Sequence, residues 1–163
     1  MLLTLLGLVG ASLARAEAPI DPKSLPISSA TTPADPGPFR CAVDPFVAVE
    51  AGETAMIRFT LSVPENTKLY RDQIAVEVLD AAGLKPGALV LPASHPFEDP
   101  YGGGPREVYS ANAELLLPVT APGTALGRAD LTVVVSWQGC GDSMCYMPGS
   151  QTFNVPVRVT RGK

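Results

Sequence analysis

Two cysteines, Cys140 and Cys145, are separated by four residues at the end of an apolar segment that runs into a turn. A disulfide that closes so short a loop removes only about 2 kcal/mol of conformational freedom from the unfolded chain. A chain of 163 residues buries enough surface for a core that does not depend on such a bridge. The pair therefore indicates chemistry or metal binding rather than a contribution to stability.

Zinc binding is the first alternative for two nearby cysteines, because thiolates are preferred zinc ligands and structural sites take four ligands. Only Cys41 and His95 could complete such a set, and neither belongs to a paired ligand motif. Catalysis by a cysteine and a histidine needs an imidazole beside the thiol, whereas His95 lies between Ser94 and Pro96 in an expected loop. We therefore expect no metal, and no cofactor other than the cysteine pair itself.

Two interpretations of the pair stay open on the residues alone. It is either a structural bridge that fixes a turn, or a dithiol that cycles between reduced and oxidised forms. Exported proteins carry many structural bridges. A short ring at the end of a strand is accessible, however, and exposed or strained disulfides are the labile ones. Because such a short disulfide also stabilises the fold only slightly, this accessibility favours the interpretation as a dithiol that cycles between its reduced and oxidised forms.

The elements that must position the cysteines are β-strands. Apolar and polar residues alternate from Ala55 to Val63, which is the period of a half-buried strand. The same alternation recurs in four further segments, at 74–78, 113–119, 131–137 and 153–159. Pro156 predicts that the last of these is an edge strand. The spacing, with turn residues between the segments, predicts an all-β sandwich of about seven strands.

A long segment rich in proline and glycine runs from Leu84 to Tyr109. Near its centre lies the stretch His95-Pro96-Phe97-Glu98-Asp99-Pro100-Tyr101, followed by three glycines. Loops of this length in compact domains are often functional. The segment is therefore a candidate part of the site.

The first residues have the pattern of an export signal. The apolar stretch from Leu2 to Leu13 is followed by the small-x-small sequence Ala14-Arg15-Ala16, which predicts a cleavable signal peptide at 1–16. Residues 17–40, with six prolines, are predicted to be a flexible linker, and residues 41–163 one globular domain. We expect no transmembrane segment in the mature chain.

Charge and export restrict the environment and the partners. The net charge of −4 provides no basic face, so nucleic acid is not an expected partner. Export places the cysteines in an oxidising compartment, where a disulfide persists.

Several motifs occur together and in order. Gln138-Gly139-Cys140 and Cys145-Tyr146-Met147-Pro148 flank a short spacer, Leu69-Tyr70-Arg71-Asp72-Gln73-Ile74 lies upstream, and Glu98-Asp99-Pro100-Tyr101-Gly102 precedes Glu107-Val108-Tyr109. These motifs resemble those of the N-terminal periplasmic domain of the thiol:disulfide interchange protein DsbD. In that family the cysteine motifs are Gln-Gly-Cys and Cys-Tyr-Pro-Pro, and the upstream motif is Leu-Tyr-Arg-Lys-Gln-Ile. The other two are the cap loop Asp-Glu-Phe-Tyr-Gly and the sequence Glu-Ile-Tyr. The resemblance covers residues 46–159, which makes it more specific than a cysteine pair alone.

The resemblance implies an immunoglobulin-like fold and thiol-disulfide exchange of the protein-disulfide reductase type. Cys145 corresponds to the cysteine that forms a mixed disulfide with a partner, and Cys140 to the cysteine that resolves it. The surroundings of the pair are assigned to Tyr70, Phe97, Glu98, Asp99, Tyr101 and Tyr146.

The resemblance also implies a location and partners. The location is the periplasm, and the partners are thioredoxin-fold proteins of the disulfide isomerase or cytochrome c maturation type. The chain ends at Lys163, without the membrane-embedded and thioredoxin-like domains that follow in DsbD. The electron donor is therefore expected to be a separate membrane protein.

The chain departs from the family pattern at three places. Its spacer between the cysteines is one residue shorter, and Lys68 replaces an aromatic residue two positions before Tyr70. Pro100 stands where the family has the aromatic residue that shields the disulfide. Phe97 is the nearby residue that could take over this shielding.

The charges in the motifs predict a thiol that is held largely protonated. Glu98, Asp99 and Asp142 would disfavour a second negative charge if they pack against Cys145. No lysine, arginine or histidine adjoins the cysteine pair in sequence. Such a thiol would react slowly with random disulfides until a docked partner changes its surroundings.

Two rival functions come from other classes. The first is a non-catalytic interaction module of immunoglobulin-like fold, in which the bridge only fixes the turn. The second is a periplasmic chaperone-like or adhesion domain. Cys41 has no partner by parity, and we assign it no catalytic role.

Overall fold

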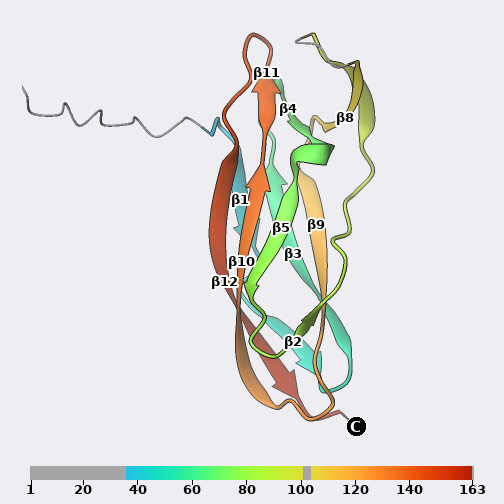
Figure 1. Cartoon of the computed structure of the whole chain (residues 1–163), viewed down its shortest axis with the longest axis vertical. Coiled ribbons are helices and arrows are strands. Elements are labelled where there is room, and N and C mark those ends of the chain that lie inside the picture. The colour runs from blue at the N-terminus through green and yellow to red at the C-terminus, as the bar shows by residue number, and fades with distance from the viewer. Residues whose placement is uncertain (1–35, 101–103, 163) are drawn as a thin grey trace, which may run out of the picture. The chain divides into compact units, whose positions relative to one another are not determined.

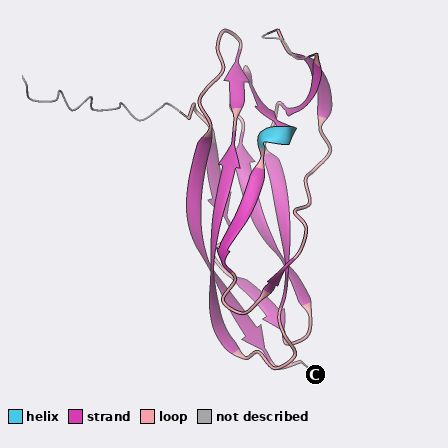
Figure 2. Ribbon diagram, in the orientation of Figure 1, coloured by secondary structure: helices cyan, strands magenta, loops and turns pink. Residues whose placement is uncertain are grey.

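The computed structural model describes residues 36–100 and 104–162. These residues form an all-β domain of twelve strands in three sheets (Figure 1). The helical content of this part of the chain is the single 3-10 turn η2 (Arg71–Gln73), drawn in cyan in Figure 2. The signal peptide expected at 1–16, and the expected linker up to residue 35, lie outside the described residues. Within them, no helix is long and apolar enough to cross a membrane.

The first sheet has the order β1-β3-β9-β6 and is antiparallel throughout. Its strands are β1 (Arg40–Val43), β3 (Thr54–Ser62), β9 (Ala113–Thr120) and β6 (Lys85–Pro86). The polar–apolar alternation predicted for the segments around 55–63 and 113–119 is confirmed by β3 and β9. Every second residue is buried from Ile57 to Leu61 in β3 and from Ala113 to Val119 in β9.

The second sheet has the order β2-β12-β10-β5. Its strands are β2 (Val47–Glu50), β12 (Gly149–Thr160), β10 (Gly127–Trp137) and β5 (Ala75–Asp80). The edge position predicted for the last strand is wrong, because β12 lies between β10 and β2. Pairing with β2 begins only at Val157, so at Pro156 the strand has one neighbour, and a proline is tolerated there.

A third, smaller sheet has the order β11-β4-β8-β7 and carries the cysteine segment. Its strands are β11 (Gly139–Gly141), β4 (Thr67–Tyr70), β8 (Pro105–Tyr109) and β7 (His95–Glu98). In Figure 1, β11, β4 and β8 lie at the end of the domain opposite the C-terminus. The segment expected to be a long loop is therefore partly a β-hairpin, formed by β7 and β8.

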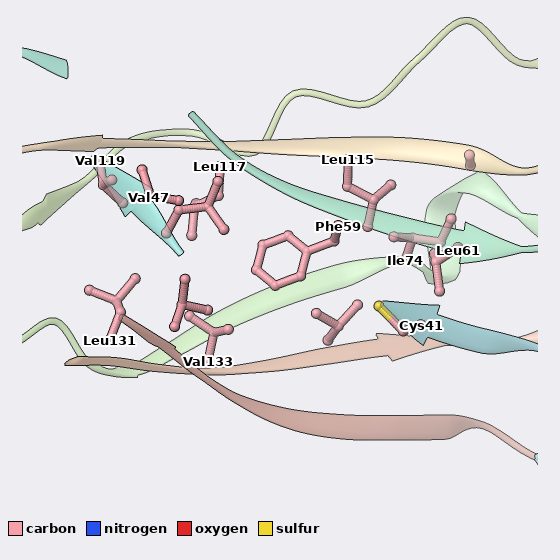
Figure 3. Packing of buried hydrophobic residues seen from close by; sticks show 14 of the residues in the cluster. Cys41, Val47, Phe59, Leu61, Ile74, Leu115, Leu117, Val119, Leu131 and Val133 are labelled. Atoms are coloured by element: carbon pink, nitrogen blue, oxygen red, sulfur yellow. The ribbon is translucent and has the colours of Figure 1, made fainter. Parts of the chain in front are cut away.

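The core lies between the first two sheets. Side chains from β3 and β9 face those of β10 and β12 across it (Figure 3). Phe59, Leu115, Leu131, Val133 and Val155 are each fully buried there. Because this core is apolar and continuous, it supplies a rigid base for the smaller sheet.

The described part of the domain has twelve strands where the alternation predicted about seven. The seven strands that the alternation did not identify are short: β6 has two residues, β11 has three, β1, β2, β4 and β7 have four each, and β8 has five. So few positions do not establish a period, and the pairing of these strands is set by their neighbours in space.

Candidate functional site

The site is built on a short hairpin that follows β10. This cysteine hairpin consists of β11, the turn after it and the segment around Cys145. Cys140 and Cys145 are joined by a disulfide, with an S–S distance of 1.99 Å and Cα atoms 3.9 Å apart. The two residues also face each other as an isolated β-bridge. Backbone N–H groups of Gly141 and Tyr146 donate to the carbonyl oxygens of Met144 and Gly139, at 2.8 and 2.9 Å. The turn between the cysteines is therefore closed by backbone hydrogen bonds as well as by the disulfide.

The two cysteines differ in exposure. Cys140 lies in β11 and is 5% exposed, whereas Cys145 follows the turn and is exposed. Exposed Met144 and half-buried Tyr146 flank Cys145 along the chain. A thiol of another protein can therefore approach Cys145 in this arrangement, while Cys140 is covered.

The register of the small sheet gathers the other site residues on one of its faces. Lys68 is the direct partner of Cys140 across β4 and β11, and Tyr70 is the partner of Val108 across β4 and β8. Paired residues on antiparallel strands share a face, as do residues two apart on one strand. Tyr70, Val108 and Cys140 form a buried cluster, against which half-buried Phe97 of β7 packs.

Tyr70 connects the disulfide to an acidic side chain. Its hydroxyl oxygen lies 3.0 Å from Sγ of Cys140 and 3.8 Å from Sγ of Cys145. The same hydroxyl donates a hydrogen bond to Oδ2 of Asp99, at 3.0 Å. The side chain of Asp99 is only 4% exposed, so this carboxylate lies inside the site.

Two cationic side chains pack on the aromatic rings of the site. The guanidinium carbon of Arg106 lies 3.7 Å from the ring centroid of Tyr70, and Nζ of Lys68 lies 4.7 Å from that of Phe97. Arg106 also contacts two carboxylates: its Nη2 lies 2.6 and 2.8 Å from the oxygens of Asp72, and its Nη1 lies 3.8 Å from Oδ2 of Asp99.

These cations change the electrostatic expectation for the site. The sequence indicated acidic neighbours alone, because no basic residue adjoins the cysteines along the chain. In the fold, Lys68 lies across from Cys140 and Arg106 pairs with the buried Asp99. Arg106 has no motif that would have identified it, since its place depends on the pairing of β8 with β4.

The other residues assigned from sequence lie around this cluster at different depths. Glu98 is exposed and pairs with Pro105 at the end of the β7–β8 hairpin. Tyr101 lies outside the described residues. Asp142 is exposed in the turn between the cysteines. His95, expected in a loop, is an exposed residue of β7 whose Nε2 lies 3.1 Å from Oγ of Ser110.

Tyr146 packs against the segment that precedes β1, which the sequence did not indicate as part of the site. Its ring meets the ring of Phe39 edge-on, with centroids 5.8 Å apart. Gly37 has φ +80°, and a Cβ there would lie 2.6 Å from Cγ of Tyr146. A Cβ on Gly139 would lie 2.5 Å from Cζ of Phe39. Phe39 is thus a buried residue that supports the cysteine hairpin. The sequence signal that could have identified it is a large apolar side chain at the end of a proline-rich segment.

Cys41 lies apart from this site. It is a free, buried cysteine that packs in the main core. Burial raises the pKa of its thiol from 9.0 to about 12. The described residues contain no group of three or more histidine, cysteine, aspartate or glutamate side chains that could hold a metal ion.

Comparison with known proteins gives one family and one fold. The family model of the N-terminal domain of the thiol:disulfide interchange protein DsbD matches residues 41–156. No curated protein sequence matches the chain. The fold is similar to the Neisseria meningitidis DsbD N-terminal domain in its reduced form, with a TM-score of 0.53, 19% identity and coverage of 66% of this chain and 82% of that one. It is also similar to a chain in the complex between the DsbD and PilB N-terminal domains of the same organism, with a TM-score of 0.52, 20% identity and coverage of 71% and 80%.

Proposed function

Because the chain belongs to the family of the N-terminal domain of the thiol:disulfide interchange protein DsbD, we propose that it relays reducing equivalents by thiol-disulfide exchange through Cys140 and Cys145. The activity is of the protein-disulfide reductase type, on an immunoglobulin-like scaffold in the periplasm. The proposal includes a signal peptide at 1–16, a linker from residue 17 and a domain that extends to residue 163. Because Phe39 is buried in the core and β1 begins at Arg40, the linker predicted at 17–40 ends before residue 39. The observation that carries it is the disulfide itself, with Cys145 exposed and Cys140 covered within the matched residues.

The loading reaction begins at Cys145. A thiolate of the donor attacks Sγ of Cys145, the Cys140–Cys145 bond breaks, and Cys140 leaves as a thiolate. A second donor thiolate then attacks the mixed disulfide and releases Cys145. The donor is oxidised to a disulfide, and the domain gains two electrons and, after protonation of both sulfurs, two protons.

The delivery reaction runs in the opposite direction. The thiolate of Cys145 attacks a disulfide of the client, which leaves one client sulfur as a thiolate and forms a mixed disulfide. Cys140 then attacks Sγ of Cys145, the Cys140–Cys145 bond forms again, and the client leaves with both of its sulfurs reduced.

The surroundings of Cys140 suit a sulfur that alternates between bonded and anionic forms. The hydroxyl of Tyr70 lies 3.0 Å from Sγ of Cys140 and can turn its proton from Asp99 to a departing thiolate. A hydrogen bond to the anion favours its departure. Lys68, paired with Cys140 in the sheet, adds a positive charge to the same face.

The proposed partners are other proteins. The complex of the DsbD and PilB N-terminal domains in Neisseria meningitidis supports a protein partner for this fold. By family resemblance, the clients are thioredoxin-fold proteins of the disulfide isomerase or cytochrome c maturation type, and the donor is a separate membrane protein. Against the alternative of an interaction module with a structural bridge stand the backbone hydrogen bonds that already close the cysteine turn.

A trapping experiment tests the proposal. In the Cys140→Ser variant, Cys145 cannot be released from a mixed disulfide, so we expect a covalent complex with a thioredoxin-fold protein from a periplasmic extract. The matched variant Cys145→Ser should trap far less, because Cys140 is covered.

The reduction potential is the second measurement. We expect a value of about −230 mV for a carrier, close to the thioredoxin and isomerase couples, and a value below about −300 mV for a structural bridge. A low potential together with no trapped protein would contradict the proposal.

A further inference from the structure

Two cation–π pairs link β4 to the β7–β8 hairpin in a crossed arrangement. Lys68 of β4 lies over Phe97 of β7, and Arg106 of β8 lies over Tyr70 of β4. β4 thus supplies one cation and one aromatic ring, and the β7–β8 hairpin supplies the other cation and the other ring. Cation–π contacts strengthen when the cation is partly withdrawn from water, as Arg106 is with a side chain that is 25% exposed.

Arg106 joins three separate segments at this point. Besides the ring of Tyr70, it contacts Asp72 of η2 and Asp99 in the segment after β7. A guanidinium group can make these contacts at once because it is planar and has donors on several sides, so one face stacks while the edge binds carboxylates. A lysine ammonium cannot reproduce this combination.

Few backbone pairs connect the β7–β8 hairpin to the rest of the domain. The ladder between β4 and β8 consists of two pairs, Leu69 with Tyr109 and Tyr70 with Val108. β7 pairs with β8 alone and forms the edge of the small sheet. Phe97, which packs against the buried cluster of Tyr70, Val108 and Cys140, therefore depends on side-chain contacts for its position.

We propose that Lys68 and Arg106 are positioning residues that keep Phe97 and Tyr70 over Cys140, and that they thereby direct incoming thiols to Cys145. The proposal rests on the proposed function, since the choice of sulfur matters to a carrier that forms mixed disulfides. It explains why only one of two bonded sulfurs is open to a partner. It also gives a role to Lys68, which stands in this chain where the family pattern has an aromatic residue.

Charge-conserving variants test the role of the two pairs. Phe97→Leu removes the ring that faces Lys68 but keeps apolar bulk, and Arg106→Lys keeps the charge but loses the planar stack on Tyr70. Their matched controls are Phe46→Leu, at an exposed phenylalanine, and Arg58→Lys, at an exposed arginine of the first sheet that pairs with Glu114 of the same sheet. Because no variant changes the net charge, a change in the alkylation rate of Cys140 reports how well its sulfur is shielded rather than a change in electrostatics.

The readout is alkylation of each thiol by iodoacetamide at one pH in the full chain. Cys140 is measured in a Cys145→Ser background and Cys145 in a Cys140→Ser background. We expect each site variant to accelerate alkylation of Cys140 roughly two- to fivefold, because the open fraction rises by the factor that one cation–π pair contributes. The rate at Cys145 should stay unchanged, so the ratio of the two rates falls.

Hydrogen exchange supplies the measurement that a general loss of stability would not reproduce. In the site variants, we expect faster amide exchange in 95–98 and 104–108, and unchanged exchange in β10 and β12. Unaltered alkylation of Cys140 in both site variants would overturn the proposal, as would an equal acceleration in the controls. These rates need no protein partner, so a failure to trap a partner would refute the carrier function and leave the positioning role standing.

Discussion

The hydroxyl oxygen of Tyr70 lies 3.0 Å from Sγ of Cys140, the covered sulfur of the disulfide. We expect Tyr70→Phe to slow reduction of the disulfide by dithiothreitol roughly tenfold, because the departing Cys140 thiolate loses a hydrogen-bond donor. The ring remains, so its stacking with Arg106 is kept. The matched control is Tyr109→Phe, which removes another buried hydroxyl that donates to the carbonyl of Pro92 at 3.0 Å. Equal rates for both variants would contradict the prediction.

Gly139 lets the cysteine strand approach both β4 and Phe39. A Cβ at this position would collide with the carbonyl oxygen of Lys68 and lie 2.5 Å from Cζ of Phe39. We expect Gly139→Ala to lower the free energy of unfolding by about 3 kcal/mol, measured by urea denaturation. Gly123→Ala is the control, because a Cβ there has no atom within 4 Å. The prediction fails if the two variants are equally stable.

Two exposed methionines lie beside Cys145, the cysteine proposed to form mixed disulfides, and we expect them to contact the partner protein. Met144 and Met147 are each 55% exposed and lie on either side of Cys145 along the chain. Methionine is flexible and adapts to apolar partner surfaces. We expect the double variant Met144→Ser, Met147→Ser to slow reduction of the domain by a thioredoxin-fold protein at least about tenfold, and to leave reduction by dithiothreitol unchanged.

The control for this variant is Met56→Ser. Met56 is 51% exposed but lies in β3, in a different sheet from the cysteine hairpin. If it slows the protein reaction as much as the double variant does, the methionines beside Cys145 have no special role in docking.

The buried thiol of Cys41 predicts a loss of stability at high pH. Its pKa is raised by burial from 9.0 to about 12, so the folded state retains a proton that the unfolded state releases. This stability is complete below pH 9.0 and is lost as the pH rises towards about 12. We expect the free energy of unfolding of the natural chain to fall by about 1 to 2 kcal/mol more than that of Cys41→Ala between pH 8 and pH 10.5.

Urea denaturation of both proteins at the two pH values measures this difference. Parallel changes would show that Cys41 does not titrate in this way. The same burial predicts that iodoacetamide at pH 8 leaves Cys41 unmodified in the folded protein, so a modified Cys41 in a peptide map would also contradict the assignment.

The sequence predicted the long strands well because they have enough positions to show a period. β3, β9 and β10 have 9, 8 and 11 residues, and their buried faces follow the alternation. The short strands could not be found in this way, although β4 and β11 are the ones that frame the cysteines. The family resemblance, which rests on motifs rather than on periods, is confirmed by the match to residues 41–156.

The site was only partly predictable for a related physical reason. Motifs identified Cys140, Cys145, Tyr70 and Asp99 as residues, but not their contacts. The pairing of Lys68 with Cys140 depends on the register between strands about 70 residues apart in sequence, which no local pattern contains. Arg106 was missed because its position on Tyr70 follows from the pairing of β8 with β4, a different pair of strands.

Phe39 and Gly37 have a practical consequence for the design of truncated proteins. A version that begins at Cys41, where the family match begins, would lack Gly37 and Phe39, against which the ring of Tyr146 packs. The cysteine turn would lose this packing, and the reactivity of the cysteine pair in the fragment would not represent that in the parent chain. The smallest fragment suitable for biochemical work therefore starts no later than Pro36.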